Sequence, residues 1–175
     1  SLYGVELQEN YASLLENNGI RCEDKIIKHK TMFDTIFSFH TLEHLPNQIE
    51  VLKNLKNYIN IGGSLIIEVP HANDFLLKNL QVEEFKEFTL WSQHLILHTK
   101  KSLTNFLTYS GYKDIEIVGF QRYGIANHLG WLKNKKPGGH KSELANIETP
   151  DLLEEYQNAL KQVDVTDTII AIAKV

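Results

Sequence analysis

The densest group of reactive side chains in this 175-residue sequence is the run His40-Thr41-Leu42-Glu43-His44. Its pattern, H-x-x-E-H, matches an arrangement in which two histidines on one helix bind zinc and the glutamate activates water. Pro46 follows closely, and a proline suits the beginning of a helix better than its interior. We therefore expect a loop at 40–44 and assign no metal to it; a zinc hydrolase that uses His40, Glu43 and His44 is kept as an alternative.

Histidines beside the expected strand ends are candidates for proton transfer, because imidazole titrates near neutral pH. His44 lies in the loop just described, and His71 follows an apolar run that ends in Val69-Pro70. We take His44 and His71 as candidate catalytic residues. The alternative is that they cap helices or pack without taking part in chemistry.

A second group, between Arg122 and Lys141, combines cations, aromatic residues and glycines. Cations beside glycines can present charge and backbone N–H groups to a phosphate, and tyrosine or tryptophan can stack on a base or a sugar. The candidate substrate-binding residues are Arg122, Tyr123, Asn127, His128 and His140. A solvated lysine-rich loop is the alternative for this segment.

The elements that must position these residues alternate between strands and helices. Short apolar or β-branched runs predict strands at 2–7, 20–27, 33–39, 64–69, 114–120 and 168–175, and apolar residues at helical spacing predict helices at 10–18, after Pro46 and at 100–110. This alternation predicts an α/β, Rossmann-like fold with a mostly parallel sheet, whose ligands bind beyond the carboxyl ends of the strands. We expect one domain over 1–175, with a substrate-side insertion at 121–167 that is helical only near 151–161.

Composition narrows the class of protein. There are 18 Lys and Arg against 22 Asp and Glu, a net charge of -4, so we expect no nucleic-acid partner. No apolar run approaches the ~20 residues of a membrane span, and no signal peptide is recognisable, so we expect no membrane association. The lone Cys22 favours a reducing compartment, and we expect a cytoplasmic protein. No feature indicates an oligomeric state.

Three segments in order resemble class I S-adenosylmethionine-dependent methyltransferases. FDTIFSFHTLEHLPNQIEVLKNLKNYINIGGSLIIEVPHAN is similar to the central part of that family, and GVELQENYASLLENNGI is similar to the unit before it. WSQHLILHTKKSLTNFLTYSGYKDIEIVGF is similar, more weakly, to the segment that ends in the family's sixth strand. The resemblance covers about residues 2–120 and implies S-adenosylmethionine as cosubstrate.

The resemblance also implies roles for particular residues. Glu6 would hold the ribose hydroxyls of the cosubstrate, Phe39 and His40 would lie along its methionine part, and His44 would reach toward the substrate. The family's first strand and Gly-rich loop have no counterpart, since the sequence contains no G-x-G, so we expect a domain truncated at its N-terminus.

The acceptor is expected to be a small molecule. RYGIANHLGWL and KPGGHK resemble segments of methyltransferases associated with surface-polysaccharide and modified-sugar synthesis. The resemblance thus implies methyl transfer to a small molecule, such as a sugar or a nucleotide-sugar. A catalytically silent domain that only binds a ligand is the remaining alternative.

Overall fold

A computed structural model describes the backbone of residues 1–175 and every side chain except that of Ile27. The chain folds into two compact units, Ser1–Phe33 and Asp34–Val175. Each unit is described by itself below. The expectation of one domain over 1–175 stays a prediction.

The first unit is a small strand–helix–strand arrangement, as predicted. Strands β1 (Tyr3–Val5) and β2 (Arg21–Glu23) pair in parallel, and helix α1 (Glu9–Asn17) connects them. The helix is followed by Gly19, whose φ of +77° lies in the left-handed region that glycine reaches without steric cost. A 3₁₀ turn, η1 (Ile26–His29), follows β2.

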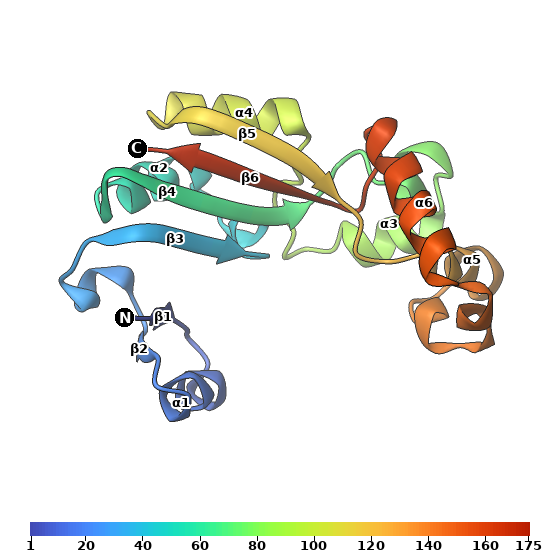
Figure 1. The fold of residues 1–175 in the computed structure, drawn as a ribbon, viewed down its shortest axis with the longest axis horizontal. Helices are drawn as coiled ribbons and strands as arrows, with labels where there is room; N and C mark the ends of the chain where they lie inside the picture. Colours follow the sequence, from blue (N-terminus) through green and yellow to red (C-terminus); the bar gives the residue numbers. More distant parts are fainter. The chain divides into compact units, whose positions relative to one another are not determined.

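The second unit is built on a four-stranded sheet in the order β3 (Phe33–Phe39), β4 (Ile59–Pro70), β6 (Thr168–Lys174), β5 (Lys113–Phe120). Strand β6 is antiparallel to both of its neighbours, whereas β3, β4 and β5 run in one direction (Figure 1). The sheet is therefore mixed, and the prediction of a mostly parallel sheet was wrong. In consequence β6 begins at the edge where the other three strands end.

One face of this sheet carries the main hydrophobic core. Alternate residues Leu65, Ile67 and Val69 of β4 are fully buried, as the two-residue period of a strand requires. They pack under α2 (Gln48–Lys56) and α4 (Lys100–Tyr109), whose Leu52 and Leu103 are also fully buried. Burial of one such side chain contributes about 2 kcal/mol to stability.

The opposite face of the sheet exposes large apolar side chains. Phe37 and Phe39 are stacked with ring centroids 5.7 Å apart and are more than half exposed. Val118, Phe120 and Ile172 on β5 and β6 are also exposed. This face is thus apolar but not packed against a core.

Two helical connections gather beyond the ends of β4 and β5 (Figure 1). The first holds η3 (Phe75–Asn79), a π-helical turn, and α3 (Glu83–Thr89). The second, at 121–167, holds α5 (Ile125–Asn134), η4 (Gly139–Lys141), η5 (Glu143–Ile147) and α6 (Pro150–Gln162). The expectation of helix only near 151–161 was wrong for α5. No helix in the described part of the chain is long and apolar enough to cross a membrane.

Within the second connection, α5 and η4 touch through two glycines. A Cβ atom on Gly130 would lie 2.6 Å from the Cα atom of Gly139, closer than real contacts allow. A Cβ on Gly139 would collide with the backbone of Ala126. The two segments therefore meet backbone to backbone.

Candidate functional site

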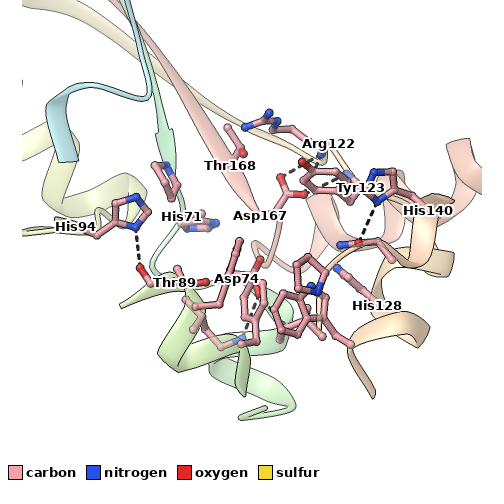
Figure 2. Close-up of a pocket in the computed structure, with 18 of the residues that line it drawn as sticks. His71, Asp74, Thr89, His94, Arg122, Tyr123, His128, His140, Asp167 and Thr168 are labelled. Atoms are coloured by element: carbon pink, nitrogen blue, oxygen red, sulfur yellow. Dashed lines mark hydrogen bonds between the residues drawn. The ribbon is translucent and has the colours of Figure 1, made fainter. Parts of the chain in front are cut away.

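A cavity of about 240 Å³ lies in the second unit, at the edge where β3, β4 and β5 end and β6 begins (Figure 2). The strand ends contribute His40 after β3, Pro70 and His71 at the end of β4, Arg122 and Tyr123 after β5, and Asp167 and Thr168 at the start of β6. The two helical connections supply the remaining wall: Asp74, Leu76, Leu77, Phe85, Phe88, Thr89, His94, Asn127, His128, Trp131, Pro137 and His140.

Aromatic rings form the apolar part of this wall. Trp131, 2% exposed, meets Phe85 edge to face with centroids 5.0 Å apart and lies 5.2 Å from Phe88. On the other side Tyr123 and His140 lie 5.0 Å apart. Such surfaces suit the face of a ring or the apolar side of a sugar.

His71 is buried and held in one orientation. Its Nδ1–H donates to the carbonyl oxygen of Thr166 at 3.0 Å, and Nε2 has no hydrogen-bond partner in the described structure. Burial lowers the pKa of His71, so the ring is neutral near pH 7. A neutral imidazole with a free Nε2 lone pair can accept a proton.

The Asp167 side chain hydrogen-bonds the start of β6 to the segment that follows β5. Its carboxylate accepts hydrogen bonds from the backbone N–H groups of Arg122 and Tyr123, at 3.1 and 3.2 Å, and from Nε2 of Gln121 at 3.0 Å. Burial nevertheless raises the pKa of Asp167. The hydrogen bonds fix where Arg122 and Tyr123 enter the cavity wall (Figure 2).

Asp74 is a second carboxylate of the wall and is buried. Its Oδ1 accepts the N–H groups of Leu76 and Leu77, at 2.6 and 3.1 Å, and so caps η3. Burial raises the pKa of Asp74 to about 7, although these two hydrogen bonds oppose the shift. The side chain is therefore present in both protonation states near neutral pH.

His40 stands between groups of opposite charge. Its φ of +44° is in the left-handed region, where the chain turns sharply out of β3. Its Nε2 lies 2.9 Å from Oε1 of Glu68 and 2.5 Å from Nη1 of Arg122, so it can donate to the first or accept from the second. Glu43, whose Oε1 lies 3.4 Å from Nδ1, is the main cause that raises the pKa of His40.

Helix α5 brings the remaining predicted residues into the same wall. Nδ1 of His128 lies 2.6 Å from Oη of Tyr156, and burial lowers the pKa of His128 to about 4. Oδ1 of Asn127 accepts a hydrogen bond from Nδ1–H of His140 at 3.2 Å. The structure thus brings together His40, His71, Arg122, Tyr123, Asn127, His128 and His140; their roles stay predictions.

Three predicted site residues do not line the cavity. His44 donates from Nδ1 to the carbonyl oxygen of Gln93 at 2.8 Å. Phe39 lies on the exposed face of the sheet. Glu6, in the first unit, accepts the N–H groups of Leu7 and Gln8 on Oε1, at 2.7 and 2.9 Å.

The H-x-x-E-H run does not form the helix that a zinc hydrolase of this pattern requires. Strand β3 runs to Phe39, His40 has a positive φ, and only Leu42–His44 form one 3₁₀ turn, η2. Pro46 follows this turn as expected. The two histidines therefore do not share a helix face.

Several wall residues were missed by the sequence reasoning. Asp167 precedes the last strand, and the expected parallel direction of that strand would put it at the far edge of the sheet. Asp74 lies four residues after the end of β4, so the rule of examining strand ends could have included it. Phe85, Phe88 and His94 lie in or after α3, a helix that was not predicted.

Comparison with known proteins gives one family and several distant relatives. The model of a family described as "Methyltransferase domain" matches residues 2–117. The tRNA U34 carboxymethyltransferase of Nautilia profundicola is 30% identical over 94 residues, 52% of this chain and 29% of that protein. The tRNA U34 carboxymethyltransferase of Idiomarina loihiensis is 26% identical over 135 residues, 75% of this chain and 40% of that protein.

A solved structure shows the same fold. It is a SAM-dependent methyltransferase of Thermotoga maritima, described as a possible histamine N-methyltransferase. The TM-score is 0.64 with 15% identity, and the match covers 99% of this chain and 72% of that one. The chain spans less than half the length of the two curated relatives.

Proposed function

Since the chain belongs to the S-adenosylmethionine-dependent methyltransferase domain family, we propose that it transfers a methyl group to a hydroxyl oxygen of a small molecule bound in the cavity. The observation that carries this proposal is the pairing of an aromatic wall with His71, a neutral histidine whose Nε2 is free. The cavity volume of about 240 Å³ suits a small acceptor.

The cosubstrate supplies an activated methyl group on a sulfonium centre. Two sets of residues have the chemistry to hold it. In the first unit, the Glu6 carboxylate, held in its own turn through Oε1, has the chemistry to accept ribose hydroxyls. In the second unit, Phe39 at the end of β3 and His40 directly after it have the chemistry to flank a methionine chain. The sequence has no G-x-G loop to hold the methionine part.

The chain's own residues would position the acceptor and take its proton. The new bond joins the acceptor oxygen to the methyl carbon, the sulfur–carbon bond breaks with its electron pair left on sulfur, and the hydroxyl proton passes to Nε2 of His71. Thr166 keeps the proton on Nδ1 and so keeps Nε2 available. Asp74, whose described hydrogen bonds all use Oδ1, can accept a second acceptor hydroxyl on Oδ2.

A sugar is the acceptor class to test first. Tyr123 and His140 offer ring faces, and Asp74 and Asn127 offer polar groups beside them. A nucleotide-linked sugar is less well supported, because Arg122 is the one Lys or Arg among the described lining residues. The cations predicted to hold a phosphate lie elsewhere; Lys135, for example, pairs with Glu84 at 3.4 Å.

Two further parts of the proposal concern the rest of the protein. We propose that a further segment supplies the Gly-rich loop and covers the exposed sheet face around Phe37 and Phe39. We also propose a cytoplasmic location, which the lone, unpaired Cys22 supports.

The test is transfer of labelled methyl from S-adenosylmethionine to a panel of free sugars and nucleotide-linked sugars, with total tRNA as the contrasting acceptor. We expect label in a sugar and none in tRNA. His71→Gln should lower kcat by about 10²-fold or more, as loss of a general base does. Asp34→Asn, an exposed change on β3, serves as the control.

Labelled tRNA without labelled small molecules would overturn the acceptor class and favour tRNA, the acceptor named for the two curated relatives. Calorimetric titration with S-adenosylhomocysteine decides whether the cosubstrate binds at all. A folded protein that does not bind it, including in a chain extended at the N-terminus where the gene encodes more residues, would favour the catalytically silent domain.

A further inference from the structure

The carboxylate of Glu43 is buried without a partner. The residue is 1% exposed, and neither Oε1 nor Oε2 accepts a hydrogen bond within the described structure. Two imidazoles face it: Nδ1 of His40 lies 3.4 Å from Oε1, and Nε2 of His44 lies 3.8 Å from Oε1. A buried carboxylate is strongly unfavourable unless a donor or a cation compensates it.

Two histidines near Glu43 (His44 and His94) are each held by a hydrogen bond from Nδ1 to a backbone carbonyl. Nδ1–H of His44 donates to the carbonyl oxygen of Gln93 at 2.8 Å, and Nδ1–H of His94 donates to that of Thr89 at 2.7 Å. Each bond leaves the Nε2 lone pair free. A backbone carbonyl on the far nitrogen is the usual support of a metal-binding histidine.

The fold holds these three residues together. The 3₁₀ turn η2 directs Glu43 inward, and Leu95 N–H donates to the Glu43 carbonyl oxygen at 2.8 Å, which ties the segment after α3 to that turn. The rings of His44 and His94 lie 4.9 Å apart. One potential ligand atom from each of Glu43, His44 and His94 lies within 4.8 Å of the others.

We propose that Glu43, His44 and His94 bind a divalent transition-metal ion, with zinc as the representative metal. Two imidazoles and one carboxylate are a common donor set for such ions, with open positions left for a further ligand. Bonds of about 2.0–2.2 Å require ligand atoms roughly 3.5 Å apart, so the side chains must draw together slightly. His44, 35% exposed at its side chain, leaves a path for the ion.

Neighbouring histidines have other roles. Both ring nitrogens of His98 are already hydrogen-bonded: Nε2 to Oε1 of Gln48 at 2.6 Å, and Nδ1 to Oγ of Ser102 at 3.1 Å. His40 faces Oε1 of Glu43 with Nδ1, and its Nε2 lies against Glu68 and Arg122. The alternative to a metal is that a protonated His40 alone balances the charge of Glu43, and this alternative requires neither His44 nor His94.

A metal here would lie at the wall of the cavity, because His94 and His40 both line it. An acceptor hydroxyl that completed the coordination would lose its proton more easily. This last step rests on the proposed methyl transfer, whereas the metal site itself does not.

The experiment is a zinc titration of protein purified without a histidine tag and stripped with a chelator, read by calorimetry and by competition with a chromophoric chelator. We expect one zinc ion per chain. His44→Asn and His94→Asn should each weaken binding at least ~100-fold, and Glu43→Gln should do the same. The matched control, His140→Asn, removes a cavity histidine outside the site and should leave zinc affinity within about twofold.

Cobalt gives a second measurement that does not depend on activity. Co²⁺ bound to this donor set should show the visible absorption of a four- or five-coordinate ion, and the His44→Asn variant should lose it. Because His44 is only partly buried, that variant is expected to fold, which circular dichroism checks. Absence of zinc binding by the folded protein, or binding that survives both His44→Asn and His94→Asn, would overturn the proposal. Since no cosubstrate is present, the outcome is separate from that of the methyl-transfer assay.

Discussion

Asp74 and Glu43 are both buried carboxylates near the cavity, but their surroundings differ. Asp74 precedes the turn η3 and receives two backbone N–H groups from it. Glu43 sits inside the one-turn helix η2, its longer side chain points inward, and no described donor reaches its oxygens. A carboxylate just before a helical turn can accept the free backbone N–H groups of that turn, whereas a carboxylate within the turn needs hydrogen-bond donors from other segments of the chain.

The largest effect expected to distinguish the two carboxylates is the pH dependence of stability that Asp74 causes. Because burial raises its folded pKa from 3.8 to about 7, the native state holds this proton over that range more tightly than the unfolded chain. The contribution of Asp74 to the free energy of unfolding is fully present below pH 3.8. It is lost as pH rises toward 7, and the loss is on the order of 4 kcal/mol. Urea unfolding at about pH 5 and about pH 8, in the wild type and in Asp74→Asn, measures it.

Asparagine caps a helical turn as well as aspartate, so Asp74→Asn keeps the local structure while removing the titration. The variant should lose less stability than the wild type between the two pH values. Equal losses in both proteins would mean that the surroundings of Asp74 do not favour its neutral form.

A smaller effect is expected at Asp167, the third carboxylate of the region. Asp167→Asn replaces an acceptor by a donor facing the N–H groups of Arg122 and Tyr123, and should cost about 2 kcal/mol in the free energy of unfolding. The control is Asp34→Asn, whose partner is the exposed amide of Asn60 and whose cost should be below ~0.5 kcal/mol. Similar costs for both substitutions would contradict the anchoring role of Asp167.

The smallest effect is expected at Glu43 in metal-free protein. Glu43→Gln removes a buried charge that has no hydrogen bond to lose, so the free energy of unfolding should fall by less than about 1 kcal/mol, or rise. Added zinc at ~100 times its dissociation constant should stabilise the wild type by about 2.7 kcal/mol and the variant hardly at all. A large loss in metal-free Glu43→Gln would show instead that protein groups already compensate this carboxylate.

The sequence was informative where local pattern decides the structure. The strand Phe33–Phe39 was predicted with its observed bounds, because an aromatic and β-branched run too short for a helix has few alternatives. His71, Arg122 and Tyr123 were identified by their places after strands. The residues of β6, TIIAIAK, suit a parallel or an antiparallel strand equally well, so they do not predict its direction. Pairing with β4 and β5 sets that direction.

The remaining differences between prediction and structure involve residues that are far apart in the sequence but close in the fold. Glu43 could be recognised as reactive, but His94, the third residue of the proposed metal site, lies about 50 positions away, after a seven-residue helix whose two phenylalanines are too few to predict it. His44 was expected to reach toward substrate, whereas in the structure its Nδ1–H donates to the carbonyl oxygen of Gln93 and its ring lies 4.9 Å from that of His94. Such contacts depend on tertiary packing rather than on spacing.

The contact between Gly130 and Gly139 bears on how the specificity of the cavity can change. At these two glycines α5 and η4 meet backbone to backbone, and a hydrogen bond between the side chains of Asn127 and His140 is added across the same joint. Asn127 and His140 can therefore be exchanged at the cost of one hydrogen bond while the glycine contact is kept, whereas Trp131 packs in a buried cluster with Leu76 and Val82. In a saturation library over 125–141, positions 127 and 140 should tolerate variety, whereas polar residues at position 131 and even alanine at either glycine should be depleted.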